Sequence, residues 1–143
     1  MNFEKLVGAA LKNDTEAMER ILAIDSKLNG LCNPDALSIE HLAKVVQVSY
    51  AAAAPDDDLH RLRGLLEEDR SLVSQRWQRA GFLPLYSAIM RGRLGAVKLL
   101  VEFGADVNAS VGPPGSALGL AEYENWPDIV EFLKSHGAVE WDD

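Results

Sequence analysis

One set of small and apolar residues occurs twice in this 143-residue chain, and each member of the first copy precedes its counterpart by 33 positions. The two copies are Leu85, Ala88, Val97, Leu100 and Gly104, and Leu118, Ala121, Val130, Leu133 and Gly137. An unbroken offset over two helix-length stretches cannot come from composition alone. A period of this length indicates a repeat architecture, in which each unit must stack on a neighbour to bury its apolar face.

The repeated positions suit a pair of helices joined by a turn. Pro84 fits the first turn of a helix, because the amide that proline lacks has no partner there. Ala88 is small enough to let a neighbouring pair of helices approach closely, and Gly92 separates the two helices. Gly104 follows the second helix, where a left-handed backbone conformation favours glycine. The pattern therefore predicts stacked helix-turn-helix units.

The first copy, residues 81–108, closely resembles the ankyrin repeat, from Gly81-Phe-Leu-Pro-Leu-Tyr-Ser-Ala to Gly104-Ala-Asp-Val-Asn108. The resemblance implies an all-α solenoid of about four helix-turn-helix units with short hairpin loops. It also implies a protein-binding module and no catalytic activity. We expect one domain over residues 1–143, with the following approximate units: 3–33, 34–78, 79–110 and 111–143.

The units outside the best match differ from the ankyrin pattern. Residues 3–29 resemble an amino-terminal repeat with a polar exposed side. The second unit is divergent, because residues 38–54 predict a helix too long for an ordinary first helix, and Pro55 stops it. In the last unit two adjacent prolines remove amide donors from residues 111–116. We therefore expect an irregular loop there rather than paired strands.

Composition fits one compact domain in a reducing compartment. Hydrophobic residues make up 48% of the chain, enough for a continuous core. Cys32 is the single cysteine, so a disulfide within the chain is impossible, and we expect a buried, inert thiol. The amino terminus contains Glu4 and no long apolar segment, which argues against a secretory signal and a membrane span. We expect a cytoplasmic protein that is monomeric when free.

The sequence contains no recognisable catalytic or metal-binding constellation. The histidines, His41, His60 and His136, fall on three different predicted helices without metal-ligand spacing. His136 precedes Gly137, where a cation offsets the dipole of the preceding helix. Residues 56–58 are all aspartate, but acidic residues at a helix start are ordinary dipole complements. We expect no enzymatic activity, no cofactor and no metal.

Charge is distributed unevenly along the chain, whose net charge is −8. Residues 1–69 contain 13 acidic and 7 basic side chains, and residues 102–143 contain 9 and 1. Residues 70–101 contain six basic side chains and no acidic one, and we call these six the basic belt: Arg70, Arg76, Arg79, Arg91, Arg93 and Lys98. An acidic protein repels nucleic acid, so we expect a protein partner. Two interpretations of the belt stay open, contact with a partner or pairing with acids of this chain.

The resemblance also implies which residues meet a partner. Ankyrin repeats usually bind through the hairpin tips and the exposed ends of the first helices. Aromatic and arginine side chains dominate binding energy at protein interfaces. Carried over to this sequence, these rules predict the partner-binding residues Trp77, Arg79, Phe82, Met90, Arg91, Tyr123 and Glu124. The divergent segment 34–58 is a further candidate contact.

Two functions fit these observations. The first is a small inhibitor of the immunity-protein or antitoxin type, which occludes a basic toxin or enzyme domain. Brevity, the lack of an appended domain and the acidic charge favour this role, because charge complementarity speeds the capture of a basic target. The alternative is a general adaptor or scaffold that joins two proteins. Residues alone do not separate the two functions.

Overall fold

The computed structural model describes residues 2–32, 38–55, 59–76, 83–108, 110–112 and 115–139. Its helices are α1 (Asn2–Leu11), α2 (Thr15–Ile24), α3 (Lys27–Cys32), α4 (Ile39–Ala53), α5 (Leu59–Glu68), η2 (Arg70–Ser74, a 3-10 helix), α6 (Pro84–Met90), α7 (Leu94–Glu102), α8 (Ala117–Tyr123) and α9 (Pro127–Ser135). One short antiparallel pair of strands, β1 (Ser110–Gly112) and β2 (Gly115–Ser116), completes the elements of the described residues. The prediction of an all-α repeat fold is confirmed.

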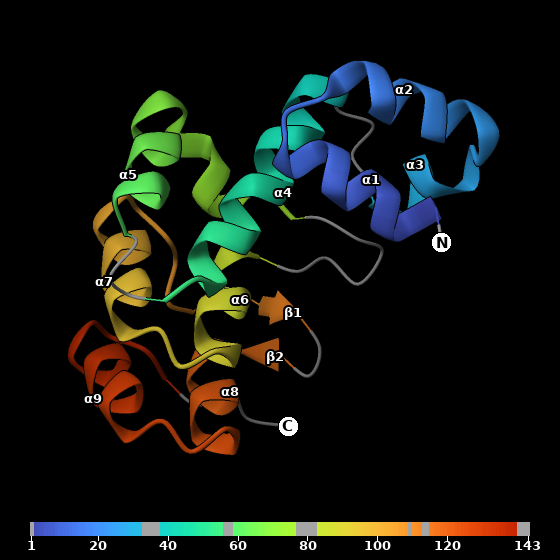
Figure 1. Ribbon diagram of the computed structural model, residues 1–143. Helices are drawn as coiled ribbons and strands as arrows, with labels where there is room; N and C mark the ends of the chain where they lie inside the picture. Colours follow the sequence, from blue (N-terminus) through green and yellow to red (C-terminus); the bar gives the residue numbers. More distant parts are fainter. Residues whose placement is uncertain are drawn as a thin grey trace.

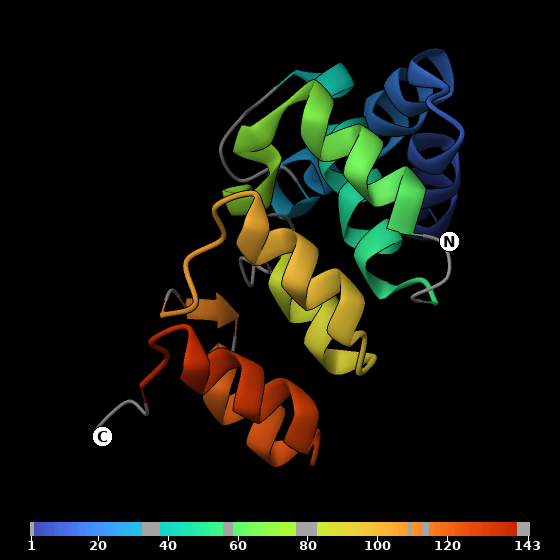
Figure 2. The same cartoon turned by 90° about the vertical axis from the view of Figure 1, so that its left-hand side faces the viewer.

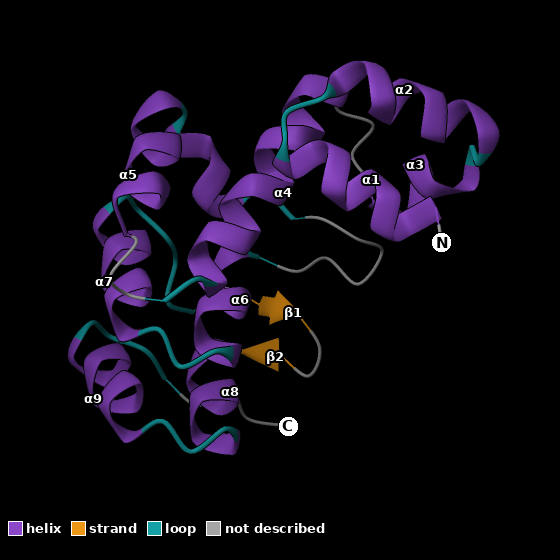
Figure 3. Ribbon diagram, in the orientation of Figure 1, coloured by secondary structure: helices purple, strands orange, loops and turns teal. Residues whose placement is uncertain are grey.

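Helices that follow one another pack as pairs, and the pairs form a stack (Figure 1). The pairs are α1 with α2, α4 with α5, α6 with α7, and α8 with α9. The first helices, α1, α4, α6 and α8, contact one another in that order, while α5, α7 and α9 form a second layer along one side (Figure 2). The hairpin lies beside α6 and α8 (Figure 3). Helix α3 is an addition after the first pair.

Left-handed residues make the turns within three of the pairs. Asn13 has φ 57°, Gly92 has φ 68° and Asn125 has φ 62°. These positions follow α1, α6 and α8 at the same distance, two residues after the last helical residue. Glycine and asparagine are the residues that adopt this conformation most readily. The expected left-handed glycine after α7 is also confirmed, since Gly104 has φ 104°.

Helix α4 confirms the long helix expected over residues 38–54. Ser38 caps it, because its hydroxyl accepts a hydrogen bond of 3.2 Å from the amide of His41. Two buried polar side chains then link α4 to its neighbours. Gln47 Nε2 donates to the Ala10 carbonyl of α1 at 2.9 Å, and the hydroxyls of Ser49 and Ser87 of α6 are 2.8 Å apart. Each junction of α4 with a neighbouring first helix thus contains a specific polar contact.

The expectation of an irregular loop instead of paired strands at residues 111–116 is wrong. Ser110 pairs with Ser116, and Gly112 pairs with Gly115, with an irregularity between the two pairs. The two prolines fall at positions 113 and 114, between the paired residues, so the pairing does not require the amides that proline lacks. Ser116 also caps α8, accepting a hydrogen bond of 2.9 Å from the amide of Gly119.

The repeated apolar positions form the core of the two best-matched pairs. Leu85, Leu100, Leu118 and Leu133 are at most 1% exposed. Val130 is the exception, because it is half-buried whereas its counterpart 33 residues earlier is fully buried. The difference follows from position in the stack, since α7 has α9 beside it and α9 is in the last pair.

We predict that Leu100→Ala lowers the free energy of unfolding by about 2–5 kcal/mol, because the substitution leaves a cavity in a packed core. Chemical denaturation followed by circular dichroism measures the change. Glu19→Ala, at an exposed position of α2, is the control and should change the stability by less than about 0.5 kcal/mol. A loss at Leu100 as small as that of the control would contradict the assigned register.

Candidate functional site

The structure places four of the seven predicted partner-binding residues at the ends of two neighbouring helices. Met90 is the last residue of α6 and is half-buried, and the exposed Arg91 follows it. Tyr123 is the last residue of α8 and is 84% exposed, and the half-buried Glu124 follows it. The other three predictions lie outside the described residues: Trp77, Arg79 and Phe82.

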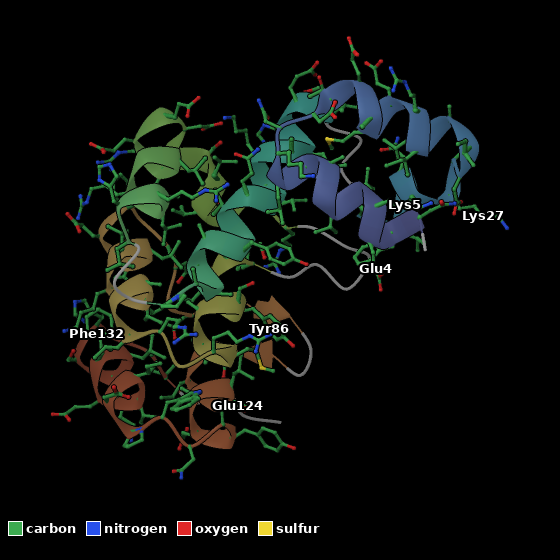
Figure 4. All side chains as sticks on the ribbon, viewed as in Figure 1. Glu4, Lys5, Lys27, Tyr86, Glu124 and Phe132 are labelled. Atoms are coloured by element: carbon green, nitrogen blue, oxygen red, sulfur yellow. The ribbon has the colours of Figure 1, made fainter. Side chains whose placement is uncertain are left out.

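The two helix ends are equivalent and adjacent. Tyr123 follows Met90 by 33 residues, and Glu124 follows Arg91 by the same interval. Because α6 packs against α8, the structure brings these four residues to one edge of the stack. Figure 4 shows Glu124 at the end of α8 and Tyr86 on the side of α6 that carries the hairpin. The edge therefore combines large apolar groups with one charge of each sign.

Tyr50 is a residue that the sequence analysis missed. It is 44% exposed and lies three residues before the end of α4, the next first helix in the stack. Residues three apart share a helix face, so Tyr50 lies on the same face of α4 as Ala53, the last residue of that helix. The 33-residue repeat does not extend to α4, so the sequence did not indicate which residues of this helix would be exposed. We define the inner surface as Tyr50, Met90, Arg91, Tyr123 and Glu124.

Members of the basic belt contact other parts of the chain. The Arg70 guanidinium lies 4.8 Å from the centre of the Phe103 ring, and the Lys98 ammonium lies 5.9 Å from that of Phe132. Arg93 Nε donates a hydrogen bond of 3.1 Å to the carbonyl of Ala53. These contacts join helix pairs to one another, whereas Arg91 is exposed on the inner surface. Arg79 lies outside the described residues.

The described residues hold no group of three or more His, Cys, Asp or Glu side chains placed to bind a metal. The expected burial of Cys32 is confirmed, because the residue is 1% exposed. Burial raises the pKa of its thiol, so the thiol stays in the unreactive protonated form at neutral pH.

The run of three aspartates, residues 56–58, lies outside the described residues. No described helix is long and apolar enough to cross a membrane.

Two polar side chains, those of His136 and Asp69, cap helix ends. His136 is the carboxy-terminal cap of α9, as expected, and its Nδ1 lies 3.0 Å from the Phe132 carbonyl. The Ser71 hydroxyl donates to Asp69 at 2.6 Å and lowers the pKa of that carboxyl, which caps η2. Both groups stabilise local structure, and neither faces the inner surface residues at the ends of α6 and α8.

Trp126 follows α8 and packs against the turn between α6 and α7. It lies so close to the turn at Gly92 that a Cβ added there would be 2.7 Å from its Cζ2 and 2.8 Å from two other indole atoms. Asn108 adds a second link, because its Nδ2 donates to the Gly137 carbonyl and its Oδ1 accepts from the Val139 amide, both at 3.0 Å. The last helix pair is thereby held firmly against the one before it.

Comparison with known proteins assigns the repeat. The family model of the ankyrin repeat matches residues 80–110. The chain therefore contains an ankyrin repeat. Ankyrin stacks present extended binding surfaces to other proteins, so the biochemical role of this stack is protein–protein interaction.

Similar ankyrin regions occur in proteins of several kinds. The chain is 40% identical over 88 residues to the serine/threonine-protein kinase VIK of Arabidopsis thaliana. This match covers 62% of this chain and 20% of the kinase. It is 37% identical over 59 residues to protein phosphatase 1 regulatory subunit 27 of Homo sapiens, covering 41% of this chain and 38% of that subunit. It is 42% identical over 53 residues to the Notch-regulated ankyrin repeat-containing protein of Xenopus tropicalis, covering 37% and 46%. The matches span less than half the length of each relative.

We predict that Gly92→Ala destabilises the ankyrin stack more than Gly104→Ala. Both glycines have positive φ, so a side chain at either position costs about 1–2 kcal/mol. The added methyl group also collides with Trp126 at position 92, whereas nothing lies within 4 Å at position 104. The collision should add about 1–3 kcal/mol, measured by denaturant unfolding. Equal losses for the two variants would show that Trp126 does not restrain the turn.

Proposed function

We propose that this ankyrin-repeat protein is a small cytoplasmic inhibitor of immunity type, an antitoxin that binds a basic toxin or enzyme domain and occludes it. The observation that carries the proposal is the inner surface, where three consecutive first helices present Tyr50, Met90 and Tyr123 beside Arg91 and Glu124. These helices pack in sequence against one another, so the spacing of the side chains is preset. A preorganised surface loses little conformational entropy when it binds.

The residue types of the inner surface are those that contribute most at interfaces. Tyrosine buries a large, rigid area and keeps a hydroxyl for a directional contact. Arg91 can bind a carboxylate through two parallel hydrogen bonds. In the proposal Trp77, Arg79 and Phe82, which lie outside the described residues, also contact the partner. Binding at such a surface blocks a target by covering it and requires no chemical step.

Charge favours a basic partner. Residues 102–143 contain 9 acidic and 1 basic side chain, within a chain of net charge −8. Complementary charge speeds diffusional encounter and disfavours acidic partners. One similar protein is by its name a regulatory subunit of a protein phosphatase, so a related repeat region occurs in a regulator of an enzyme.

A general adaptor is the second candidate function. The similar region of the plant kinase makes up 20% of that protein, which suits a module that connects other parts of a complex. Affinity capture with this chain as bait separates the two candidates. An inhibitor is expected to retain one partner in stoichiometric amount and to abolish the activity of that purified partner, whereas an adaptor retains several partners and leaves their activities intact.

We predict that Tyr123→Ala and Arg91→Ala each weaken binding of the captured partner by at least about 1–2 kcal/mol, because both remove an exposed side chain of the inner surface. Calorimetry measures the affinity, and circular dichroism should be unchanged. Glu16→Ala, at an exposed position of α2 in the first pair, is the control and should bind normally. If Tyr123→Ala and Arg91→Ala both bind like the wild type, the partner contacts another surface.

We predict that association with the partner slows as salt concentration rises, while dissociation changes much less. Electrostatic attraction between exposed charges is screened beyond about 8–10 Å at about 0.1–0.15 M salt. Stopped-flow measurements at about 50 mM and about 500 mM salt test this expectation. An association rate that is the same at both concentrations would remove electrostatic capture from the proposed mechanism.

A further inference from the structure

The last helix pair has a pocket on the side that faces away from the preceding pair. Its volume is about 470 Å3, and residues of α8, α9 and the turn between them line it. The residues that matter here are Glu122, Asn125, Trp126, Val130, Glu131 and Lys134. None of the residues that line the pocket belongs to the inner surface, and the two sites meet at the end of α8.

The internal repeat identifies this pocket as a docking surface. The residues 33 positions before Asn125 and Glu131 are Gly92 and Lys98. In the preceding pair both face the last pair, because Gly92 lies against Trp126 and the Lys98 ammonium lies 5.9 Å from the centre of the Phe132 ring. The pocket is thus the last pair's copy of the surface on which the preceding pair receives its neighbour.

The protein itself shows two side chains that occupy this kind of surface. The Trp126 indole packs against the turn at Gly92 of the preceding pair. Arg93, which precedes Trp126 by 33 residues, binds the end of α4 in the pair before it. The tryptophan arrangement requires a glycine, since a Cβ at position 92 would lie 2.7 Å from the indole. The turn residue of the last pair is Asn125, which carries a Cβ. An indole placed like that of Trp126 is therefore excluded from the pocket.

The arginine arrangement requires only an acceptor at a helix end. Arg93 Nε donates to the carbonyl of Ala53, the last residue of α4, at 3.1 Å. The corresponding residue of α8 is Tyr123, also the last of its helix. Its carbonyl has no intrahelical donor four residues later, because residue 127 is proline. The end of α8 thus offers the same acceptor, at the edge of the pocket that Glu122 and Asn125 line.

Charge at the pocket selects a cation with several donors. The exposed Glu122 and Glu131 line it against one basic residue, Lys134. The carboxy-terminal end of a helix adds partial negative charge. A guanidinium has five donors in a planar arrangement, so it can bind a carbonyl and a carboxylate together, whereas an ammonium is a compact point charge. We propose that this pocket binds an arginine side chain of a protein partner.

Acetyl-arginine amide is the probe that tests the site, and acetyl-lysine amide is its comparison. In NMR titrations of the isotope-labelled protein, the arginine probe should shift the amides of residues 121–134 and the indole N–H of Trp126. Trp126 lines the pocket, so its indole resonance reports on binding there. The lysine probe should bind more weakly. This experiment needs no knowledge of the partner and does not depend on the proposed inhibitory function.

A double variant supplies the matched control. Glu122→Gln with Glu131→Gln should weaken binding of the arginine probe about fivefold, the effect of two exposed charge contacts. Glu16→Gln with Glu19→Gln removes the same charge from exposed positions on α2, in the first pair, and should leave binding unchanged. Equal binding of the two probes, equal effects of the two double variants, or shifts spread over all acidic regions would overturn the proposed site.

Discussion

The packing of α4 between α1 and α6 joins the amino-terminal helices to the rest of the stack. Gln47 and Ser49 make the polar contacts at these two junctions, and both side chains are 5% exposed. Residues two apart in a helix are rotated by about 200°, so the two side chains leave α4 in nearly opposite directions. Buried polar groups stabilise a fold only when their hydrogen bonds are made, which makes these contacts specific for one register. Tyr50, next to Ser49, is placed by the same register.

Repetition in the sequence predicted the two helix pairs of the second half of the structure in detail, but not the hairpin between them. Leu100 and Leu133 are fully buried because each lies at the same place in a helix pair, and the glycines that follow these helices adopt the expected positive φ. The first half could be predicted only in outline. Helix α3 has no counterpart in the repeat, and α4 is 15 residues long whereas α6 and α8 have 7 each. A period cannot locate elements that depart from it.

The candidate surface was accessible to sequence analysis to the extent that it follows the period. Met90 and Tyr123 were found because both precede a turn of the repeat by two residues. Tyr50 was missed because the 33-residue period does not extend to α4, so no counterpart indicated which of its residues would be exposed. The basic belt shows the same limitation. Its residues are close in sequence, but Arg70 and Lys98 lie over aromatic rings while Arg91 is exposed. Linear charge counts do not reveal which side chains a fold engages internally.

The hydrogen bonds of Gln47 also bear on the cooperativity of unfolding. In a stack whose units contact mainly their neighbours, stability is a sum of unit terms and interface terms, and units unfold together only while each interface is strong. The interface of α1 with α4 combines apolar packing with one amide side chain, Gln47, that binds both the Ala10 carbonyl and Asn13. Loss of that side chain would remove the buried hydrogen bond to the Ala10 carbonyl, which would keep only the Asn13 amide as a donor. A sufficiently weakened interface would let helices α1 to α3 unfold before the pairs that carry the inner surface, and a single unfolding transition would become two.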